Sequence, residues 1–138
     1  WWYKVRIMKK ITIYQGKRKR AIARAVLSAG KGMVILNGRL LQNYENKVLQ
    51  LRIAEPLVLA GDIVKGIDVS ITVNGGGASG QADAARLAIA RALVDYDQSL
   101  KKVFYDYDRL LLVADVRQNE SCKPNDSKPM AKRQKSYR

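Results

Sequence analysis

The chain contains no histidine and only one cysteine among its 138 residues. Without histidine it lacks the commonest general base, the serine-type catalytic triads and most zinc or iron sites. The lone Cys122 excludes an intramolecular disulfide and a multi-cysteine zinc site. No apolar run approaches the roughly 18 residues that span a bilayer, and cations interrupt the N-terminal stretch WWYKVRIMKK before a signal peptide could form. We therefore expect a soluble intracellular protein without a metal or cofactor.

Acidic residues are scarce at both ends of the chain. Residues 1–31 hold ten Lys or Arg and no acid, a net charge of +10. Residues 32–116 hold nine cations and ten acids, a net charge of −1, and residues 117–138 hold seven cations and two acids, a net charge of +5. A nearly neutral body with two basic ends indicates a polyanion that is contacted at particular places. Nucleic acid fits better than a membrane surface, because no amphipathic lipid-binding helix is evident.

Hydrophobic periodicity predicts the elements of one domain. Apolar and polar residues alternate in the predicted strands 5–13, 20–28 and 67–74, and the apolar run MVIL at 33–36 is predicted as another strand. Gly16 is expected to end the first strand, and the turn at 30–32 is expected to join the second and third strands into a hairpin spanning 20–36. The predicted helices are 42–60, bent or restarted at Pro56, and 81–96 and 98–105.

This order of elements indicates an α+β fold, with one four-stranded sheet and helices over one face. The other face is expected to be polar, because Asp68, Ser70, Thr72 and Asn74 alternate with apolar residues along the strand 67–74. Periodicity disappears after Asp115. We therefore expect a globular RNA-binding domain at 1–115 and an extended basic tail at 116–138.

A glycine-rich loop, NGGGASGQA at 74–82, lies between a predicted strand and a predicted helix. Backbone N–H groups at such a place can hold a phosphate, and a nucleotide site is one interpretation. The phosphate-loop pattern fails because no Lys-Ser/Thr follows the glycines, and the dinucleotide fingerprint fails on spacing. We favour a tight backbone turn that can contact RNA phosphates.

Two carboxylates, Asp106 and Asp108, flank Tyr107. In an extended segment they would face the same way, as a magnesium site requires. The favoured interpretation is structural, with local salt bridges and caps that involve Arg109.

Cations concentrate in KRKR at 17–20 and in the terminal KRQKSYR. The first run precedes a structured strand that carries Arg24, so its side chains are suited to phosphates at fixed spacing. In the tail, Gln134, Ser136 and Tyr137 can hydrogen-bond to or stack on a nucleotide. A disordered basic appendage or a nuclear-targeting run is the simpler alternative for the tail.

Several segments occur in the order and spacing of a known family. They are GKRKRAIARAVLSAGKGMVILNGRLL (16–41), RIAEPLVLAGD (52–62), DVSITVNGGGASGQADAARLAIARALV (68–94), YDRLLLVAD (107–115) and KRQKSYR (132–138). Together they resemble the ninth protein of the small ribosomal subunit in its archaeal and eukaryotic form. The neck of the tail departs from that pattern, because Val116 replaces a proline, Gln118 replaces an arginine, and residues 125–127 stand where glycines are expected.

The resemblance implies a fold shared with the second domain of ribosomal protein five and a structural, non-enzymatic role in translation. It implies binding to ribosomal RNA and neighbouring proteins in the head of the cytoplasmic small subunit, with the tail reaching the tRNA in the peptidyl site. No membrane is implied. The candidate rRNA-binding residues are Lys17, Arg18, Lys19, Arg20, Arg24, Lys31, Gly75, Gly76, Gly77, Arg117, Lys128, Lys132 and Arg133, and the candidate tRNA contacts are Lys135, Ser136, Tyr137 and Arg138.

Two other functions remain open at this point. One is an enzyme on the same fold, either a phosphotransferase that uses the loop 75–80 or a nuclease subunit that uses Asp106 and Asp108. The other is an RNA-binding protein that acts away from the ribosome.

Overall fold

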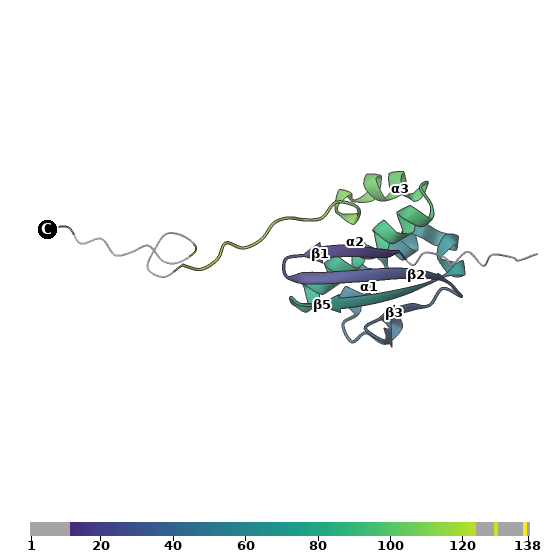
Figure 1. Ribbon diagram of the computed structural model, residues 1–138, viewed down its shortest axis with the longest axis horizontal. Coiled ribbons are helices and arrows are strands. Elements are labelled where there is room, and N and C mark those ends of the chain that lie inside the picture. The colour runs from purple at the N-terminus through teal and green to yellow at the C-terminus, as the bar shows by residue number, and fades with distance from the viewer. Residues whose placement is uncertain (1–11, 124–128, 130–136, 138) are drawn as a thin grey trace, which may run out of the picture.

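A computed structural model describes residues 12–123, 129 and 137. The elements follow each other as a strand-rich first half and a helix-rich second half (Figure 1). They are β1 (Ile13–Arg18), β2 (Ala21–Ala29), β3 (Val34–Leu36), β4 (Arg39–Leu40), η1 (Leu41–Asn43), α1 (Lys47–Ala60), η2 (Gly61–Gly66), β5 (Ile67–Asn74), α2 (Ala78–Tyr96), α3 (Leu100–Tyr107) and η3 (Arg109–Leu111). The predicted α+β class with helices on one face is confirmed, but the sheet has five strands because the two-residue β4 adds an edge.

The strands are arranged in the order β1-β2-β5-β3-β4. β2 pairs antiparallel with β1 and with β5, whereas β3 pairs parallel with β5. The hairpin predicted for 20–36 is therefore wrong, since β5 lies between β2 and β3. The chain leaves β3, crosses through α1 and returns as β5, and such a crossover is how parallel neighbours are joined.

The core lies between the sheet and α2, which is seen behind the strands in Figure 1. Ala21, Ala23 and Ala25 of β2 are fully buried, and small side chains on α2 let the helix approach closely. The first strand is predicted at 5–13 and Gly16 is predicted to end it; residues 5–11 lie outside the described residues, and β1 runs from Ile13 to Arg18 with Gly16 inside it. A Cβ there would stand 2.1 Å from the carbonyl oxygen of Ala84 in α2, so only glycine allows this contact.

All three predicted helices are found, but α1 begins at Lys47, five residues later than predicted. Asn46 caps α1 by accepting from the backbone N–H of Val48 (3.1 Å) and Leu49 (3.4 Å), and Pro56 lies inside the helix without interrupting it. α2 begins at Ala78, three residues earlier than predicted, directly after the glycines. Across the described parts of the chain, no helix is long and apolar enough to cross a membrane.

The segment after α2 folds differently from the sequence expectation. Asp106 lies in α3 and Asp108 follows it as the C-cap, so the extended arrangement that would make them face the same way is absent from this described segment. η3 then anchors the chain, because Leu111 is fully buried. Residues 116–123 are irregular, as predicted, and the division at residue 115 remains a prediction.

Candidate nucleic-acid interface

The basic run 17–20 and the glycine-rich loop 74–82 meet at one end of the sheet. β1 ends at Arg18 and β2 begins at Ala21, so Lys19 and Arg20 form the turn between them, with Lys19 at a positive φ of 53°. The glycines that follow β5 pack against this turn. A Cβ on Gly75 would stand 2.7 Å from the carbonyl oxygen of Arg20, and one on Gly76 would stand 2.9 Å from the backbone nitrogen of Ala21. Glycine is therefore required for the basic turn and the glycine loop to touch.

The same end of the domain holds the N-terminus of α2. Gly77 is the N-cap residue and offers no side-chain hydrogen bond to the helix. The first N–H groups of a helix carry a partial positive charge and can bind an anion. The side-chain amide of Gln81 donates to the Gly75 carbonyl (3.0 Å) and so connects the first helical turn to the loop. The uncapped N–H groups lie beside the basic turn, since a Cβ on Gly80 in the first helical turn would stand 3.6 Å from the carbonyl oxygen of Arg18.

A hollow of about 780 Å³ joins these elements to the start of the tail. It is lined by the basic turn, by the first residues of α2 and by the chain at 118–122. Ser79 lies in the glycine-rich loop 74–82 that the sequence singles out, whereas the segment 118–122 was not predicted as part of this site. No sequence signal could have placed 118–122 here, because its position depends on the path of an irregular tail.

The two cations of the run that lie in β1, Lys17 and Arg18, are on opposite faces of the sheet. Side chains alternate along a strand, so Lys17 lies on the face away from the helices and Arg18 on the helix side. Arg24 shares the open face with Lys17, because Lys17 pairs with Ile22 and Arg24 pairs with Gln15 and Thr72. This face carries exposed polar side chains along β5, as predicted. The two cations are diagonal neighbours on a polar surface.

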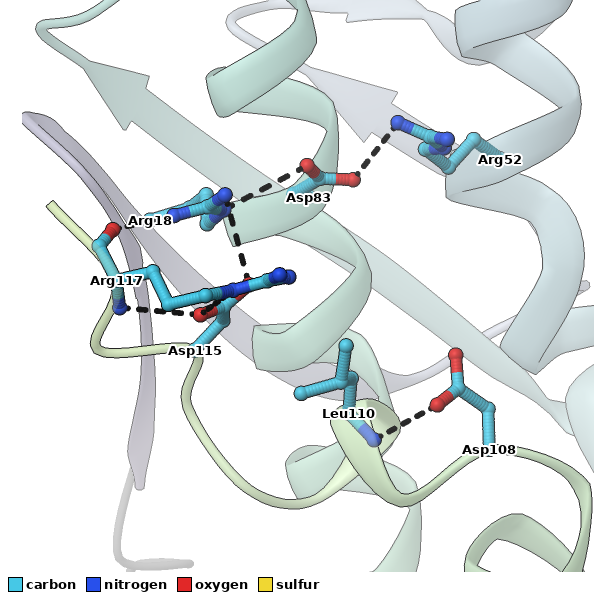
Figure 2. A network of polar contacts seen from close by, with 7 residues as sticks. All are labelled: Arg18, Arg52, Asp83, Asp108, Leu110, Asp115 and Arg117. Carbon is cyan, nitrogen blue, oxygen red and sulfur yellow. Dashed lines mark hydrogen bonds and ion pairs between the residues drawn. The ribbon is translucent and has the colours of Figure 1, made fainter. Parts of the chain in front are cut away.

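Arg18 is mostly buried and is held inside the molecule. Its guanidinium donates to the backbone carbonyl of Arg117 (2.7 Å) and lies 3.5 Å from the Asp115 carboxylate and 4.0 Å from that of Asp83. Figure 2 shows it between α2 and the start of the tail. Arg18 thus differs from its neighbours in having internal partners.

Asp115 receives a fork of hydrogen bonds from Arg117. Nε donates to Oδ1 (3.0 Å) and Nη2 to Oδ2 (2.7 Å), and the backbone N–H of Arg117 adds a third bond (3.1 Å). These bonds hold the pKa of Asp115 well below its usual range and raise that of Arg117. The predicted RNA contact of Arg117 has to be made by a side chain already paired with Asp115.

Lys31 lies at the opposite end of β2 from the other candidates. The backbone N–H groups of Lys31 and Met33 donate to Oδ1 of Asp68, at 2.8 and 2.9 Å. These bonds lower the pKa of Asp68 below its usual value. A Cβ on Gly30 would stand 1.9 Å from the Asp68 carboxyl carbon, so the carboxylate fills the turn. The structure does not bring Lys31 together with Lys17, Lys19 and Arg20.

The two carboxylates considered for catalysis have structural surroundings. Asp108 accepts from the Leu110 backbone N–H (2.9 Å) and pairs with Arg86 (2.9 Å), and Figure 2 shows the first of these contacts. The partner is Arg86 rather than the expected Arg109. Within residues 12–123, 129 and 137, no three His, Cys, Asp or Glu side chains are grouped to hold a metal ion.

The far tail is mostly outside the described residues. Lys128, Lys132, Arg133, Lys135, Ser136 and Arg138 fall there, and Tyr137 is described as exposed.

Comparison with known proteins agrees with this architecture. The model of the family described as Ribosomal protein S9/S16 matches residues 16–138. The chain is 50% identical over 128 residues to the small ribosomal subunit protein uS9 of Thermoplasma volcanium, with 91% of this chain and 97% of that protein covered. Identity to the uS9 proteins of Thermoplasma acidophilum and Methanococcus vannielii is 49% and 44%, with 91% and 94% of this chain and 99% of each relative covered.

These matches show that the chain is a ribosomal protein, which is a structural component and not an enzyme. The match extends from Gly16 in β1 to Arg138 at the end of the tail. The chain belongs to the Ribosomal protein S9/S16 family.

Proposed function

We propose that the protein is a structural constituent of the cytoplasmic small ribosomal subunit, binding ribosomal RNA and neighbouring proteins in the head. Its tail then reaches the tRNA in the peptidyl site. The three uS9 relatives carry the name of that subunit, which supports this assignment.

One observation supports RNA binding most strongly. Lys19, Arg20 and the uncapped N-terminus of α2 lie at one end of the domain, and the glycines 75–77 connect them. Backbone N–H groups and cations fixed by a rigid fold are suited to phosphate oxygens at set spacing. Lys17 and Arg24 extend the positive surface onto the open sheet face. Within residues 12–123 we propose Lys17, Lys19, Arg20, Arg24 and the glycine loop as the principal phosphate contacts.

Salt dependence of binding to small-subunit head RNA tests this proposal. Each phosphate neutralised should contribute about −0.7 to −0.9 to the slope of log affinity against log salt. The triple variant Lys17→Gln/Lys19→Gln/Arg20→Gln should make the slope shallower by roughly 2 to 3. The matched control Lys101→Gln/Lys102→Gln/Arg109→Gln removes the same charge from exposed sites on α3 and η3 and should keep the wild-type slope. Equal slopes for the two triple variants would contradict the proposed surface.

The tail is tested by deleting residues 132–138. We expect the domain to fold and to enter subunits, because the deleted segment has no apolar periodicity. Peptidyl-site tRNA should bind more weakly, with Arg138 the strongest single candidate for the lost contact. A deletion that unfolds the domain would show that these residues belong to the core.

A further inference from the structure

Five charged residues of alternating sign connect both large helices to the start of the tail (Figure 2). Arg52 of α1 bonds to Asp83 of α2 at 3.1 Å, and Asp83 faces Arg18 of β1. Arg18 faces Asp115, which pairs with Arg117. The series therefore crosses three elements of the domain before it reaches the tail.

The inner pair of this series is the best shielded from solvent. The side chains of Arg18 and Asp115 are 17% and 12% exposed, whereas that of Arg117 is 79% exposed. Ion pairs withdrawn from water are screened less by salt than exposed pairs. The Arg18–Asp115 contact should therefore persist where a surface pair would not.

Arg18 holds the tail at two points that are two residues apart. Its guanidinium pairs with the Asp115 carboxylate and also donates to the backbone carbonyl of Arg117 at 2.7 Å. A side-chain contact alone would leave the backbone free to rotate, but a contact to a side chain and a later carbonyl fixes the backbone direction between them. The planar guanidinium can supply both bonds, which a lysine ammonium does less well.

This contact follows the last buried anchor before the exposed neck. Leu111 is fully buried, and Arg91 donates to the carbonyl of Leu112 at 3.3 Å. After Arg117, the side-chain hydrogen bond found in the described neck runs within the tail itself, from Lys123 to Glu120. In Figure 1 the described part of the tail leaves the domain on the side where β1 turns into β2.

We propose that Arg18 and Asp115 form a clamp that fixes the direction in which the tail leaves the domain. One cation of the KRKR run thus positions the tail from within, while Lys17, Lys19 and Arg20 remain for external phosphates. The clamp is a property of the free chain. Its use in delivering the tail to tRNA rests on the proposed function.

The single cysteine provides a direct measurement of this direction. Cys122 is exposed and lines the same hollow as Ser79 and Gly80. A nitroxide attached to Cys122 of the full chain should broaden the amide resonances of Ser79 and Gly80. We expect this relaxation enhancement to fall severalfold in Asp115→Asn and in Arg18→Lys. The lysine keeps the positive charge but lacks the planar guanidinium that reaches both the Asp115 carboxylate and the Arg117 carbonyl. Asp115→Glu, which keeps the carboxylate, should restore part of it.

Asp106→Asn is the matched control, because it neutralises an exposed carboxylate on α3 away from the clamp. It should leave the broadening unchanged. Wild-type broadening in both Asp115→Asn and Arg18→Lys would overturn the proposal. Unfolding of the domain by either variant would overturn it too, because the contact would then belong to the core.

The role in delivery is measured separately, on subunits that carry Asp115→Asn. They should bind peptidyl-site tRNA more weakly than wild type, although every tail cation is present. If the label shows the clamp but tRNA binding is unchanged, the proposed function of the tail is wrong and the clamp stands.

Discussion

Two glycine-containing turns at opposite ends of β2 show how similar residues serve different purposes. At the 30–32 end, the backbone N–H groups of Lys31 and Met33 are bound by the carboxylate of Asp68. At the 75–77 end, the N-terminus of α2 has no side-chain cap, and Lys19 and Arg20 lie beside it. The first turn carries its own anion within the domain, whereas the second has donors and cations available for an external one.

The role of a glycine turn therefore depends on whether its N–H groups bind a carboxylate of the same domain or remain available for an external anion. Glycine and lysine occur at both ends, so residue type alone does not separate them. Glu120, an acid that lines the hollow at the 75–77 end, is paired with Lys123 at 2.6 Å. Under the proposed function, an RNA phosphate would occupy at this end the place that Asp68 takes at the other.

The largest expected effect concerns the fit of the glycine loop to the basic turn. In Gly76→Ala, a Cβ would stand 2.9 Å from the backbone nitrogen of Ala21 on a residue with φ of +66°. Positive φ together with a clash against backbone should lower the free energy of unfolding by about 2–4 kcal/mol. The neighbouring Gly77→Ala is the matched control, because its Cβ meets no atom within 4 Å and its φ is −97°.

The control should change the free energy of unfolding by less than about 0.5 kcal/mol. Urea denaturation of both variants measures the difference. Equal destabilisation by the two substitutions would show that the loop does not pack on the basic turn.

A smaller effect is expected from removing the internal anion at the other end. In Asp68→Asn the N–H groups of Lys31 and Met33 lose a charged acceptor, so the protein should be less stable at neutral pH. The pKa of Asp68 is lowered in the folded state, so its contribution is complete above the ordinary value of 3.8 and is lost as pH falls through the folded pKa. The difference in urea midpoint between wild type and Asp68→Asn should therefore be largest near pH 7 and shrink below pH 3.8.

Asp106→Asn serves as the reference variant here as well, and its difference from wild type should be small at both pH values. A difference for Asp68→Asn that does not vary with pH would show that its carboxylate does not hold the turn through charge.

Most helices and inner strands were predictable from the sequence, but the position of β1, the short β4 and the order of the strands were not. The strand at 67–74 was predicted because its alternation of apolar and polar residues is complete, and the structure buries Ile67, Val69, Ile71 and Val73 as that pattern requires. The turn at 30–32 was also recognised, but a turn does not reveal which strand lies next to which. β5 takes the place between β2 and β3 because of a crossover, a long-range contact without a local signal.

The residue types of the candidate site were predicted from the sequence. Which of its cations binds inside the protein and which faces outward was not predicted. Alternation along β1 could have placed Arg18 opposite to Lys17, but the partner Asp115 lies 97 residues further along the chain. Gly16 was misread because a glycine in a strand is compatible both with a break and with close approach of another backbone. Only the position of Ala84 on α2 separates these cases.

The smallest expected effect comes from giving the 75–77 end an anion of its own. Gly77 has φ of −97° and ψ of 171°, which suits an N-cap residue with a side chain. In Gly77→Asp the carboxylate should accept from the first N–H groups of α2, and stability should rise by a few tenths of a kcal/mol. Affinity for head RNA should fall about two- to fivefold, because the added charge repels the phosphate and occupies its donors.

Gly77→Asn separates the two causes, since its amide oxygen can cap the helix without charge. If occupied donors weaken RNA binding, Asn should lower the affinity too, and if repulsion dominates, only Asp should, with a loss that salt reduces. Filter binding at two salt concentrations measures the RNA affinity and its salt dependence, and urea denaturation measures the change in stability. RNA affinity unchanged in both variants would mean that no phosphate binds at the N-terminus of α2, and the contrast between the two ends of β2 would then rest on the cations Lys19 and Arg20 alone.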